Sequence, residues 1–363
     1  MTALKPGSTI GILGGGQLGR MLAMAAARLG LKSHIYAPEA DSPAFDVAAE
    51  HTIAAYDDQT ALTRFALSIG VATYEFENIP VPTVEFLSKH VPVRPGAKAL
   101  ACAQDRINEK TLARDLGAMT ADFASVNSYD ELLTRLGQIP APCVLKTRRF
   151  GYDGKGQAKI LDRADGKAAW KMMKDQPSIL ESFVQFQSEV SVIAARGLDG
   201  EFRAFDVTEN EHRNHILFRS LAPARIKPKA AADAIDIAKR IAETLDYVGV
   251  FAIEFFALDF SKQEVLYVNE MAPRVHNSGH WTIDGAETSQ FEQHIRAVAG
   301  WPLGSTKMKT PGAEMINLIG DDILAWDKIA AEPGAFLHHY GKKDVKAGRK
   351  MGHVNRLLAK APK

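Results

Sequence analysis

Residues 251–270 read FAIEFFALDFSKQEVLYVNE, a pattern that predicts a β-hairpin with one glutamate on each strand. Two apolar runs flank a short polar loop, as in antiparallel strands joined by a turn. If Asp259 lies opposite Val265, the antiparallel register places Glu254 directly opposite Glu270. The hairpin therefore brings two carboxylates together in apolar surroundings.

Opposed carboxylates of this kind indicate a cation site. Directly opposite side chains have Cβ atoms about 4.5–5.5 Å apart, and like charges there repel. Mg²⁺ takes oxygen ligands and is usually held by one or two carboxylates together with substrate phosphates. We therefore predict that Glu254 and Glu270 bind Mg²⁺, with Mn²⁺ as a possible substitute. The alternative is two solvated strand residues.

A glycine-rich loop earlier in the chain is the candidate phosphate-binding segment. Residues 148–157 read RRFGYDGKGQ and follow Lys146 on a predicted strand at 143–147. Backbone amides and cations in such a loop can cover nucleotide phosphates, although the chain has no G-x-x-x-x-G-K-[ST] motif. A surface hairpin is the alternative interpretation.

Polar side chains directly follow the second glutamate. Residues 271–281 read MAPRVHNSGHW and could reach a substrate lying beside the phosphates. His276 and His280 have the spacing of zinc ligands on a helix, but Asn-Ser-Gly between them favours a loop. Farther on, residues 342–350 are rich in lysine and arginine, which predicts either a solvated loop or a site for a substrate phosphate.

Near the N-terminus, residues 10–20 read IGILGGGQLGR, with glycines spaced G-x-G-x-x-G after an apolar run. Dinucleotide-binding turns share this spacing and have an acidic residue about 20 positions later for the ribose. Glu39 is near that place but follows a proline in a loop-like stretch. An NAD-dependent oxidoreductase and a tight turn in a nucleotide-free α/β unit both remain open from this segment.

The composition is that of an ordinary globular protein. The 363 residues predict two or three domains, and 46% hydrophobic with 24% charged residues is a typical balance. A net charge of +1 favours neither nucleic acid nor an anionic membrane as partner. We see no leader or membrane-spanning run, and two cysteines suit a reducing compartment, so we expect a cytoplasmic location.

The order of predicted elements indicates three units. Strands and helices alternate over the first hundred residues, which predicts a parallel sheet, and a small α+β unit with the glycine loop follows. Strands then dominate, apart from a helix at 230–245. The predicted domains are 1–104, 105–186 and 187–363.

Together these segments resemble the ATP-grasp superfamily and, within it, the N(5)-carboxyaminoimidazole ribonucleotide synthetases of bacterial and fungal purine biosynthesis. The likeness is carried by GGGQLGRM, TYEFEN, GYDGKGQ, DYVGV, NEMAPRVHNSGHWT and GRKMGH, and spans nearly the whole chain. It implies an α/β and α+β ATP-grasp fold with a Rossmann-like N-terminal domain, a small lid domain and a C-terminal antiparallel sheet. It also implies a homodimer.

The resemblance implies a reaction of ATP, bicarbonate and 5-aminoimidazole ribonucleotide that gives ADP, phosphate and the carbamate at the 5-amino nitrogen through carboxyphosphate. NAD has no part in it. Other ATP-grasp ligases would share Lys146, Glu254 and Glu270, but the segment RVHNSGHW is not expected in them.

The resemblance also implies roles for individual residues. Around ATP we expect Arg106, Lys110, Lys146, Gly151, Asp153, Gly154, Gly156, Gln157, Glu181, Val184, Glu189, His212 (or its neighbour His215) and Asn269. Around the aminoimidazole nucleotide we expect Gly16, Gln17, Leu18, Asn277, Ser278, His280, Lys343, Arg349 and Lys350. Tyr152, Lys155 and Arg274 would hold the intermediate, and Glu75, with Glu77 as second choice, and His276 would accept or relay the amine proton.

Overall fold

A computed structural model describes residues 3–151, 154–260 and 263–362, and its N-terminal unit is a parallel sheet in the order β3-β2-β1-β4. The sheet is parallel as predicted, with the buried β1 between β2 and β4, whereas the half-exposed edge strand β3 was not predicted. The unit consists of β1 (Thr9–Leu13), α1 (Gln17–Arg28), β2 (Lys32–Ala37), η1 (Phe45–Val47), β3 (Glu50–Ile53), α2 (Gln59–Ser68) and β4 (Val71–Tyr74).

Three helices lead out of this unit: α3 (Val81–Ser88), α4 (Ala97–Ala103) and α5 (Arg106–Asp115). The Asp105 side chain caps α5 by accepting a hydrogen bond from the Ile107 backbone N–H at 3.0 Å. Ala113 of α5 is buried in the same hydrophobic cluster as Val268 of the C-terminal sheet. The segment expected as a lid therefore begins with a helix that packs on the C-terminal sheet.

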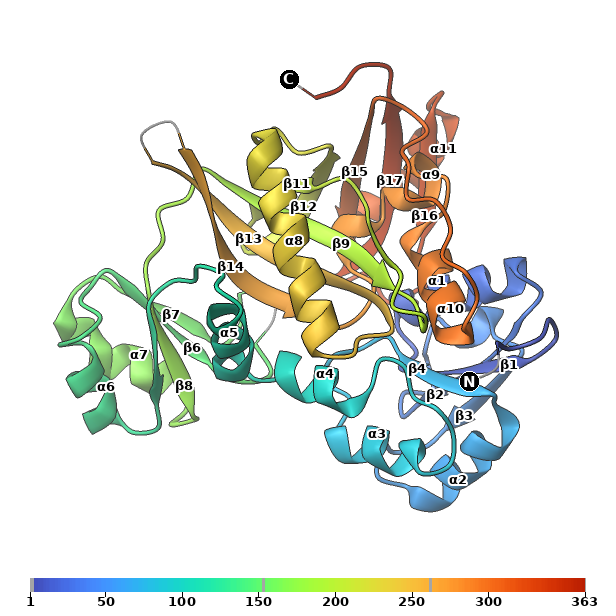
Figure 1. Cartoon of the computed structure of the whole chain (residues 1–363), viewed down its shortest axis with the longest axis horizontal. Helices are drawn as coiled ribbons and strands as arrows, with labels where there is room; N and C mark the ends of the chain where they lie inside the picture. Colours follow the sequence, from blue (N-terminus) through green and yellow to red (C-terminus); the bar gives the residue numbers. More distant parts are fainter. Residues whose placement is uncertain (1–2, 152–153, 261–262, 363) are drawn as a thin grey trace.

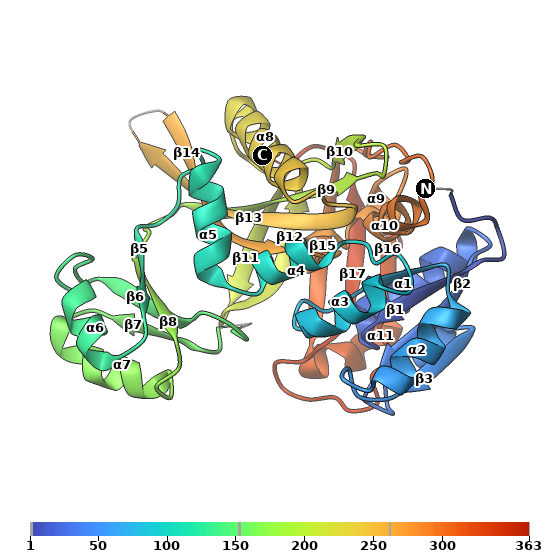
Figure 2. The ribbon, with the colours of Figure 1, turned by 60° about the horizontal axis from the view of Figure 1, so that its bottom comes forward.

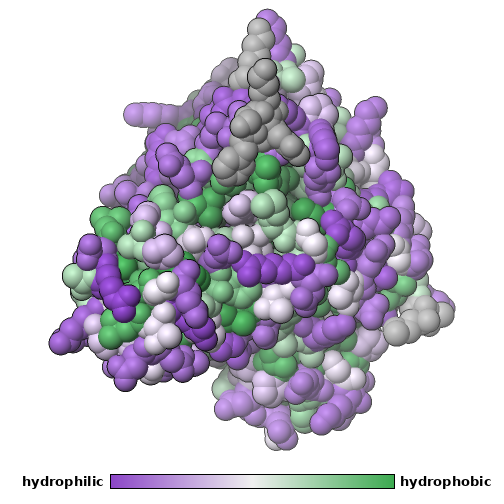
Figure 3. Space-filling model, turned by 60° about the vertical axis from the view of Figure 1, so that its left-hand side comes forward, coloured by the Kyte–Doolittle hydropathy of each residue, from purple (hydrophilic) through white to green (hydrophobic). Residues whose placement is uncertain are grey.

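The small unit is an antiparallel sheet in the order β5-β8-β6-β7 with its own core. Its elements are β5 (Phe123–Val126), α6 (Tyr129–Arg135), β6 (Cys143–Thr147), β7 (Gln157–Ile160), η2 (Arg163–Asp165), α7 (Gly166–Met172) and β8 (Ser178–Ser182). Figures 1 and 2 show this unit and the N-terminal unit at opposite ends, with the large sheet between them. On the side shown in Figure 3, hydrophobic side chains gather toward the middle among hydrophilic ones.

The C-terminal part is built on a large sheet in the order β14-β13-β9-β11-β12-β15-β17-β16, with β10 beside β9. Its strands are β9 (Ser188–Arg196), β10 (Phe202–Ala204), β11 (Thr208–Arg213), β12 (Ile216–Ala222), β13 (Gly249–Phe260), β14 (Gln263–Ala272), β15 (Gly312–Ile319), β16 (Ala335–His339) and β17 (Lys350–Leu358). Its helices are α8 (Pro228–Thr244), η3 (Asn277–Gly279), α9 (Thr282–Gly285), α10 (Gln290–Ala299), η4 (Gly320–Ala325) and α11 (Trp326–Ala331).

Helices cover both faces of this sheet. Phe251 and Ile253 of β13 share a hydrophobic cluster with Ala238 of α8, and Figure 1 shows α8 lying across that face. Val250 and Ala252, which alternate with them, belong to the opposite cluster, around α10. Glu254 continues this second series at the edge of the cavity described below.

Helix α10 joins the N-terminal unit to the large sheet. Its Ile295 is fully buried in a cluster that includes Leu22 of α1 and Val250 of β13. His294 Nε2 lies 2.7 Å from Thr73 Oγ1 in β4, and His294 Nδ1 accepts a hydrogen bond from Val250 N–H at 3.0 Å. These two units thus share one core. Among the described residues, we find no helix with the length and apolar character required to cross a bilayer.

Candidate active site

Two adjoining cavities lie along the large sheet. A cavity of about 610 Å³ separates the small unit from the sheet, and one of about 520 Å³ lies between the N-terminal unit and the sheet. Both are lined by the same group of side chains: Arg106, Glu270, His276, Asn277 and Lys350. A molecule held in one cavity would therefore share a wall with a molecule held in the other.

The predicted acidic pair forms on this hairpin, although the predicted register near the turn is wrong. Asp259 pairs with Glu264 rather than Val265. A register shift then leaves Asn269 as an extra residue of β14, so that Glu254 pairs with Glu270. The β-bulge compensates for the one-residue error.

The charges around this pair are unequal. Arg106 Nη1 lies 3.1 Å from Glu270 Oε2; burial opposes ionisation of Glu270, but the guanidinium holds its pKa below the usual range. Burial, followed by repulsion from Glu270, raises the pKa of Glu254. Oxygen donors whose negative charges repel fit a divalent cation, and Glu254 and Glu270 are the residues that would hold Mg²⁺. Within the described residues, no group of three or more His, Cys, Asp or Glu side chains is arranged to hold a metal.

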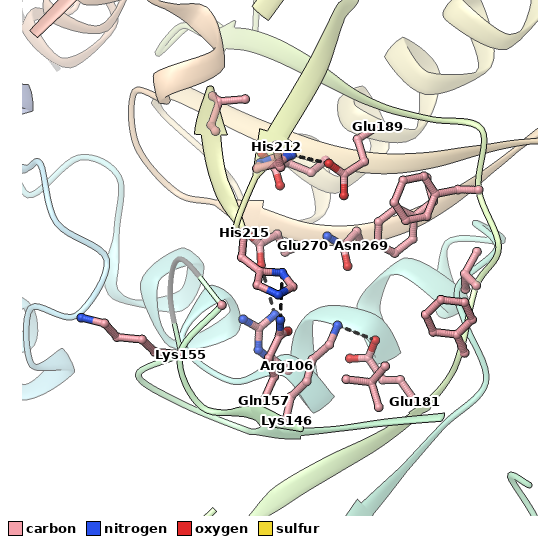
Figure 4. Close-up of a pocket in the computed structure, with 18 of the residues that line it drawn as sticks. Arg106, Lys146, Lys155, Gln157, Glu181, Glu189, His212, His215, Asn269 and Glu270 are labelled. Atoms are coloured by element: carbon pink, nitrogen blue, oxygen red, sulfur yellow. Dashed lines mark hydrogen bonds and ion pairs between the residues drawn. The ribbon is translucent and has the colours of Figure 1, made fainter. Parts of the chain in front are cut away.

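Lysines from two elements meet the buried Glu181 beside the larger cavity. Lys146 Nζ of β6 and Lys110 Nζ of α5 lie 2.9 and 3.4 Å from Glu181 Oε2. Burial opposes ionisation of Glu181, but the two ammonium groups lower its pKa to about 2. Lys146 and Glu181 line the cavity (Figure 4), whereas Lys110 is only 1% exposed and lies behind them.

One end of this cavity is apolar and aromatic. The rings of Phe186 and Phe256 stack with centroids 4.5 Å apart, and Val184, one of the residues expected around ATP, lines the same cavity. The two phenylalanines were not predicted. Their positions shortly after β8 and on the β13–β14 hairpin could have suggested them. This end could hold a purine base.

Both candidate histidines line the larger cavity. His212 Nδ1 contacts Glu189, and although burial opposes protonation, this carboxylate raises the pKa of His212. His215 Nδ1 lies 3.4 Å from Gln157 Nε2 in the small unit. Figure 4 shows the first pair on the sheet side and the second spanning the cavity. The structure thus gives the two histidines different neighbours.

The glycine loop borders both cavities. Gly154 and Lys155 line the larger one and Gly151 the smaller one, although the Lys155 side chain extends away from the other labelled side chains in Figure 4. Gly156 is next to them but lines neither cavity. Tyr152 and Asp153 lie outside the described residues.

The opening glycines surround a carboxylate. Gly16 N–H donates to Glu75 Oε1 at 2.8 Å, and a Cβ atom at Gly14 or Gly16 would lie 2.7 or 2.8 Å from the Glu75 side chain. Burial raises the pKa of Glu75. Glu75 thus occupies the amide that a pyrophosphate would use in a dinucleotide-binding turn. Gly16, Gln17 and Leu18 line the smaller cavity.

Arg274 and Lys350 bring positive charge to the smaller cavity. Arg274 pairs with Glu77. Burial opposes ionisation of Glu77, but its contact with the Arg274 guanidinium lowers the pKa of Glu77. Lys343, by contrast, is exposed and pairs with Asp41. Of the predicted basic group, Lys350 is the one brought to the cavities; Lys343 and Arg349 line neither.

The segment after Glu270 contains both cavity-lining and buried residues. Within the described structure, both amide atoms of Asn277 are buried without a hydrogen-bond partner beside the cavities. Ser278 and His280 are fully buried and line neither cavity. His280 instead packs against Phe291 and His353. Direct substrate contact by Ser278 or His280, and a zinc pair of His276 and His280, are therefore not supported by this geometry.

Glu109 is a further cavity residue, and it was not among those predicted from the sequence. It is 5% exposed, lines the smaller cavity and lies three residues after Arg106 on α5. Burial raises its pKa. Glu109 lies nearly one helical turn after Arg106, and this spacing could have identified it from the sequence.

Comparisons with known proteins match successive parts of the chain. Residues 7–104 match a ribonucleotide synthetase preATP-grasp domain, 111–291 an ATP-grasp domain, and 313–362 a phosphoribosylaminoimidazole carboxylase C-terminal domain. The fold is accordingly an ATP-grasp fold preceded by a preATP-grasp domain.

Whole-chain relatives agree. The N5-carboxyaminoimidazole ribonucleotide synthase of Brucella melitensis is 49% identical over 98% of both chains. The bifunctional purine synthesis protein purC/E of Dictyostelium discoideum is 47% identical; the match covers 97% of this chain and 37% of that longer protein. The crystal structure of the Aspergillus clavatus N5-carboxyaminoimidazole synthase with ADP and 5-aminoimidazole ribonucleotide has a TM-score of 0.90 at 29% identity, covering 98% of this chain and 95% of that one.

Proposed function

Because this chain belongs to the N5-carboxyaminoimidazole ribonucleotide synthase family, we propose that it is an ATP-dependent carbon-nitrogen ligase of purine biosynthesis. It joins bicarbonate to the 5-amino nitrogen of 5-aminoimidazole ribonucleotide. The products are N5-carboxyaminoimidazole ribonucleotide, ADP and phosphate.

The observation that carries this proposal is the wall shared by the two cavities. Bicarbonate has to react first with the γ-phosphate of ATP and then with an amine, so its site must border both partners. Arg106, His276, Asn277 and Lys350 line both cavities. ATP fits the larger cavity, with its base at Phe186 and its phosphates toward Lys146. The aminoimidazole nucleotide fits the smaller one.

The residues also suit the chemistry. Bicarbonate is a poor electrophile, and attack of its oxygen on the γ-phosphorus would give carboxyphosphate. Lys146 would stabilise charge on the transferring group, and Mg²⁺ held by Glu254 and Glu270 would, when bound, neutralise phosphate charge. Arg274, with Lys155 and Tyr152, would hold the carboxylated intermediate away from water.

Glu75 is the proposed acceptor of the amine proton. Its raised pKa brings it closer to the operating pH than an ordinary carboxylate. Glu77 is less suited because it is paired with Arg274. Lys350 and the Gln17 side chain, which line the smaller cavity, would bind the ribonucleotide phosphate.

Three further points belong to the same proposal. We propose a homodimer, the state that the family resemblance implies, and sedimentation velocity would test it. A cytoplasmic location is supported by the two free thiols, Cys102 and Cys143, and cell fractionation would test it. We keep the units 1–104, 105–186 and 187–363 as functional divisions, with α5 anchoring the second to the large sheet.

The experiment is an omission assay. ADP and phosphate release from Mg-ATP are followed with 5-aminoimidazole ribonucleotide and bicarbonate each left out in turn, together with product formation from labelled bicarbonate. We expect strong release and a labelled, acid-labile product only when the aminoimidazole nucleotide is present. Equal release of ADP and phosphate with and without this nucleotide would overturn the proposed substrate.

A further inference from the structure

A chain of buried polar side chains runs from the interior of the large sheet to His276. Ser220 Oγ of β12 donates to Asn210 Oδ1 of β11 at 2.9 Å, and Asn210 Nδ2 donates to Ser191 Oγ of β9 at 3.0 Å. Ser191 Oγ lies 2.7 Å from Ser278 Oγ, which lies 2.8 Å from His276 Nδ1. The three serines are fully buried and Asn210 is 7% exposed.

The direction of this chain is fixed at its His276 end. The Ser278 backbone N–H donates to His276 Nδ1 at 3.4 Å, and a backbone N–H cannot act as an acceptor. His276 Nδ1 must therefore carry a lone pair, and the Ser278 hydroxyl must donate to it as well. Ser278 then accepts from Ser191, and Ser191 accepts from the Asn210 amide.

The opposite side of the imidazole ring agrees with this direction. His276 Nε2 lies 3.4 Å from Glu254 Oε1, an oxygen that can accept a hydrogen bond. A neutral ring with a lone pair on Nδ1 carries its proton on Nε2. His276 itself lines both cavities, so this N–H lies at the wall between them.

We propose that Ser220, Asn210, Ser191 and Ser278 are positioning residues that hold His276 in the Nε2–H form, making it a hydrogen-bond donor at the active site. The identity of the accepting oxygen rests on the proposed function: Glu254 in the resting enzyme and the carboxyl group being transferred during turnover. His276 then does not accept the amine proton, in contrast to the expectation from sequence. Glu75 remains the candidate for that step.

The test is the tautomer of His276 in the resting enzyme, read from ¹H–¹⁵N correlation spectra of ¹⁵N-histidine-labelled full-length protein. The His276 signals are assigned by their loss in His276→Gln. We expect the Nε2–H pattern in the wild type. An Nδ1–H pattern would overturn the proposal, whether or not the Ser220 variants fold.

Ser220→Ala and Ser220→Thr test whether the buried chain sets this form. The 3.4 Å contact from the Ser278 backbone N–H holds the ring only weakly by itself. Without the Ser220 hydroxyl the Asn210 amide can turn over, so we expect Ser220→Ala to give a mixture of tautomers and roughly tenfold lower kcat. Ser220→Thr keeps the hydroxyl and should restore both the Nε2–H tautomer and the wild-type kcat. Ser178→Ala is the matched control, because Ser178 is a fully buried serine of the small unit that donates to Gln176 O. An unchanged tautomer in Ser220→Ala would overturn the role of the chain.

These measurements separate the two proposals. The spectra are recorded without substrates, so an Nε2–H ring in a protein that fails the omission assay would leave this inference standing and remove the substrate assignment. Carboxylation by a protein whose His276 carries its proton on Nδ1 would keep the substrate assignment and remove this inference.

Discussion

Glu254 and Glu270 are direct cross-strand partners because Asn269 forms a β-bulge between Glu270 and Val268. The bulge changes which face each residue of β14 occupies. Val268 and Met271, an odd number of positions apart, are both buried in the cluster beneath α8. In an unbroken strand Glu270 would share the face of Val268 and enter that core. The bulge turns it to the cavity and leaves the Asn269 carbonyl 3.1 Å from Lys110 Nζ.

Removing either carboxylate of this pair should abolish catalysis while preserving the fold. Glu254→Gln and Glu270→Gln each remove a carboxylate proposed to bind Mg²⁺, and losing several kcal/mol of transition-state stabilisation corresponds to roughly a thousandfold lower kcat. A Mg²⁺ titration of turnover measures this. Asp259→Asn, an exposed carboxylate on the same strand, is the control and should behave as wild type. Near-normal activity of both glutamine variants would exclude the metal assignment.

Lys350 and Lys343 should differ sharply although they belong to one basic segment. Lys350→Met removes a cation from the cavity wall and should lower kcat/KM for 5-aminoimidazole ribonucleotide roughly 10- to 100-fold. Lys343→Met removes an exposed pair with Asp41 and should stay within about twofold. Steady-state kinetics at saturating ATP would compare them, and equal effects of the two variants would contradict the placement of Lys350.

Gly154 tests the contact between the glycine loop and the large sheet. A Cβ at this position would lie 2.5 Å from His215 Cβ, and the backbone φ is +77°. Gly154→Ala should therefore lower kcat/KM for ATP by roughly tenfold or more. Gly30→Ala has a similar φ of +71° with nothing within 4 Å, so it matches the backbone strain of roughly 1–2 kcal/mol without the clash. The prediction fails if the two alanine variants bind ATP equally well.

His294 should make stability depend on pH. Burial lowers its pKa from 6.5 to about 3, so folding favours the neutral ring. Its stabilising contribution is complete above pH 6.5 and is lost as the pH falls from 6.5 toward 3. Between pH 7 and pH 5 the wild type should lose about 2 kcal/mol relative to His294→Gln. Denaturant unfolding of both proteins at the two pH values measures this difference; parallel curves would show that His294 does not titrate in this way.

Much of the local structure follows from the sequence alone. Apolar runs bounded by turn residues identified β1, β6 (Cys143–Thr147) and the β13–β14 hairpin, because strand periodicity and turn preference are local properties. The family was recognisable for a similar reason, since its motifs are short and contiguous. The half-exposed edge strand β3 was missed because it lacks such an apolar run.

Local sequence did not show which candidates would meet in space. Lys343 and Lys350 are indistinguishable as members of a basic run, and only the path of the chain into β17 brings Lys350 to the cavities. Glu109 and the phenylalanines at the apolar end of the larger cavity gained importance only through distant neighbours. Their roles depend on contacts between elements far apart in the chain.

The sequence by itself determined that two glutamates lie on one hairpin, because alternation and turn position are encoded within about 20 residues. Tertiary structure decided that both glutamates face the cavity. The bulge at Asn269 lets Val268 and Met271 both pack in the core beneath α8, and this turns Glu270 away from that core. It also decided that His276 Nε2 lies beside Glu254 and that Ser278, on the other side of the ring, ends a hydrogen-bonded chain. The other members of this chain, Ser191, Asn210 and Ser220, come from three separate strands. Packing and hydrogen-bond direction are properties of the assembled sheet, and no single segment specifies them.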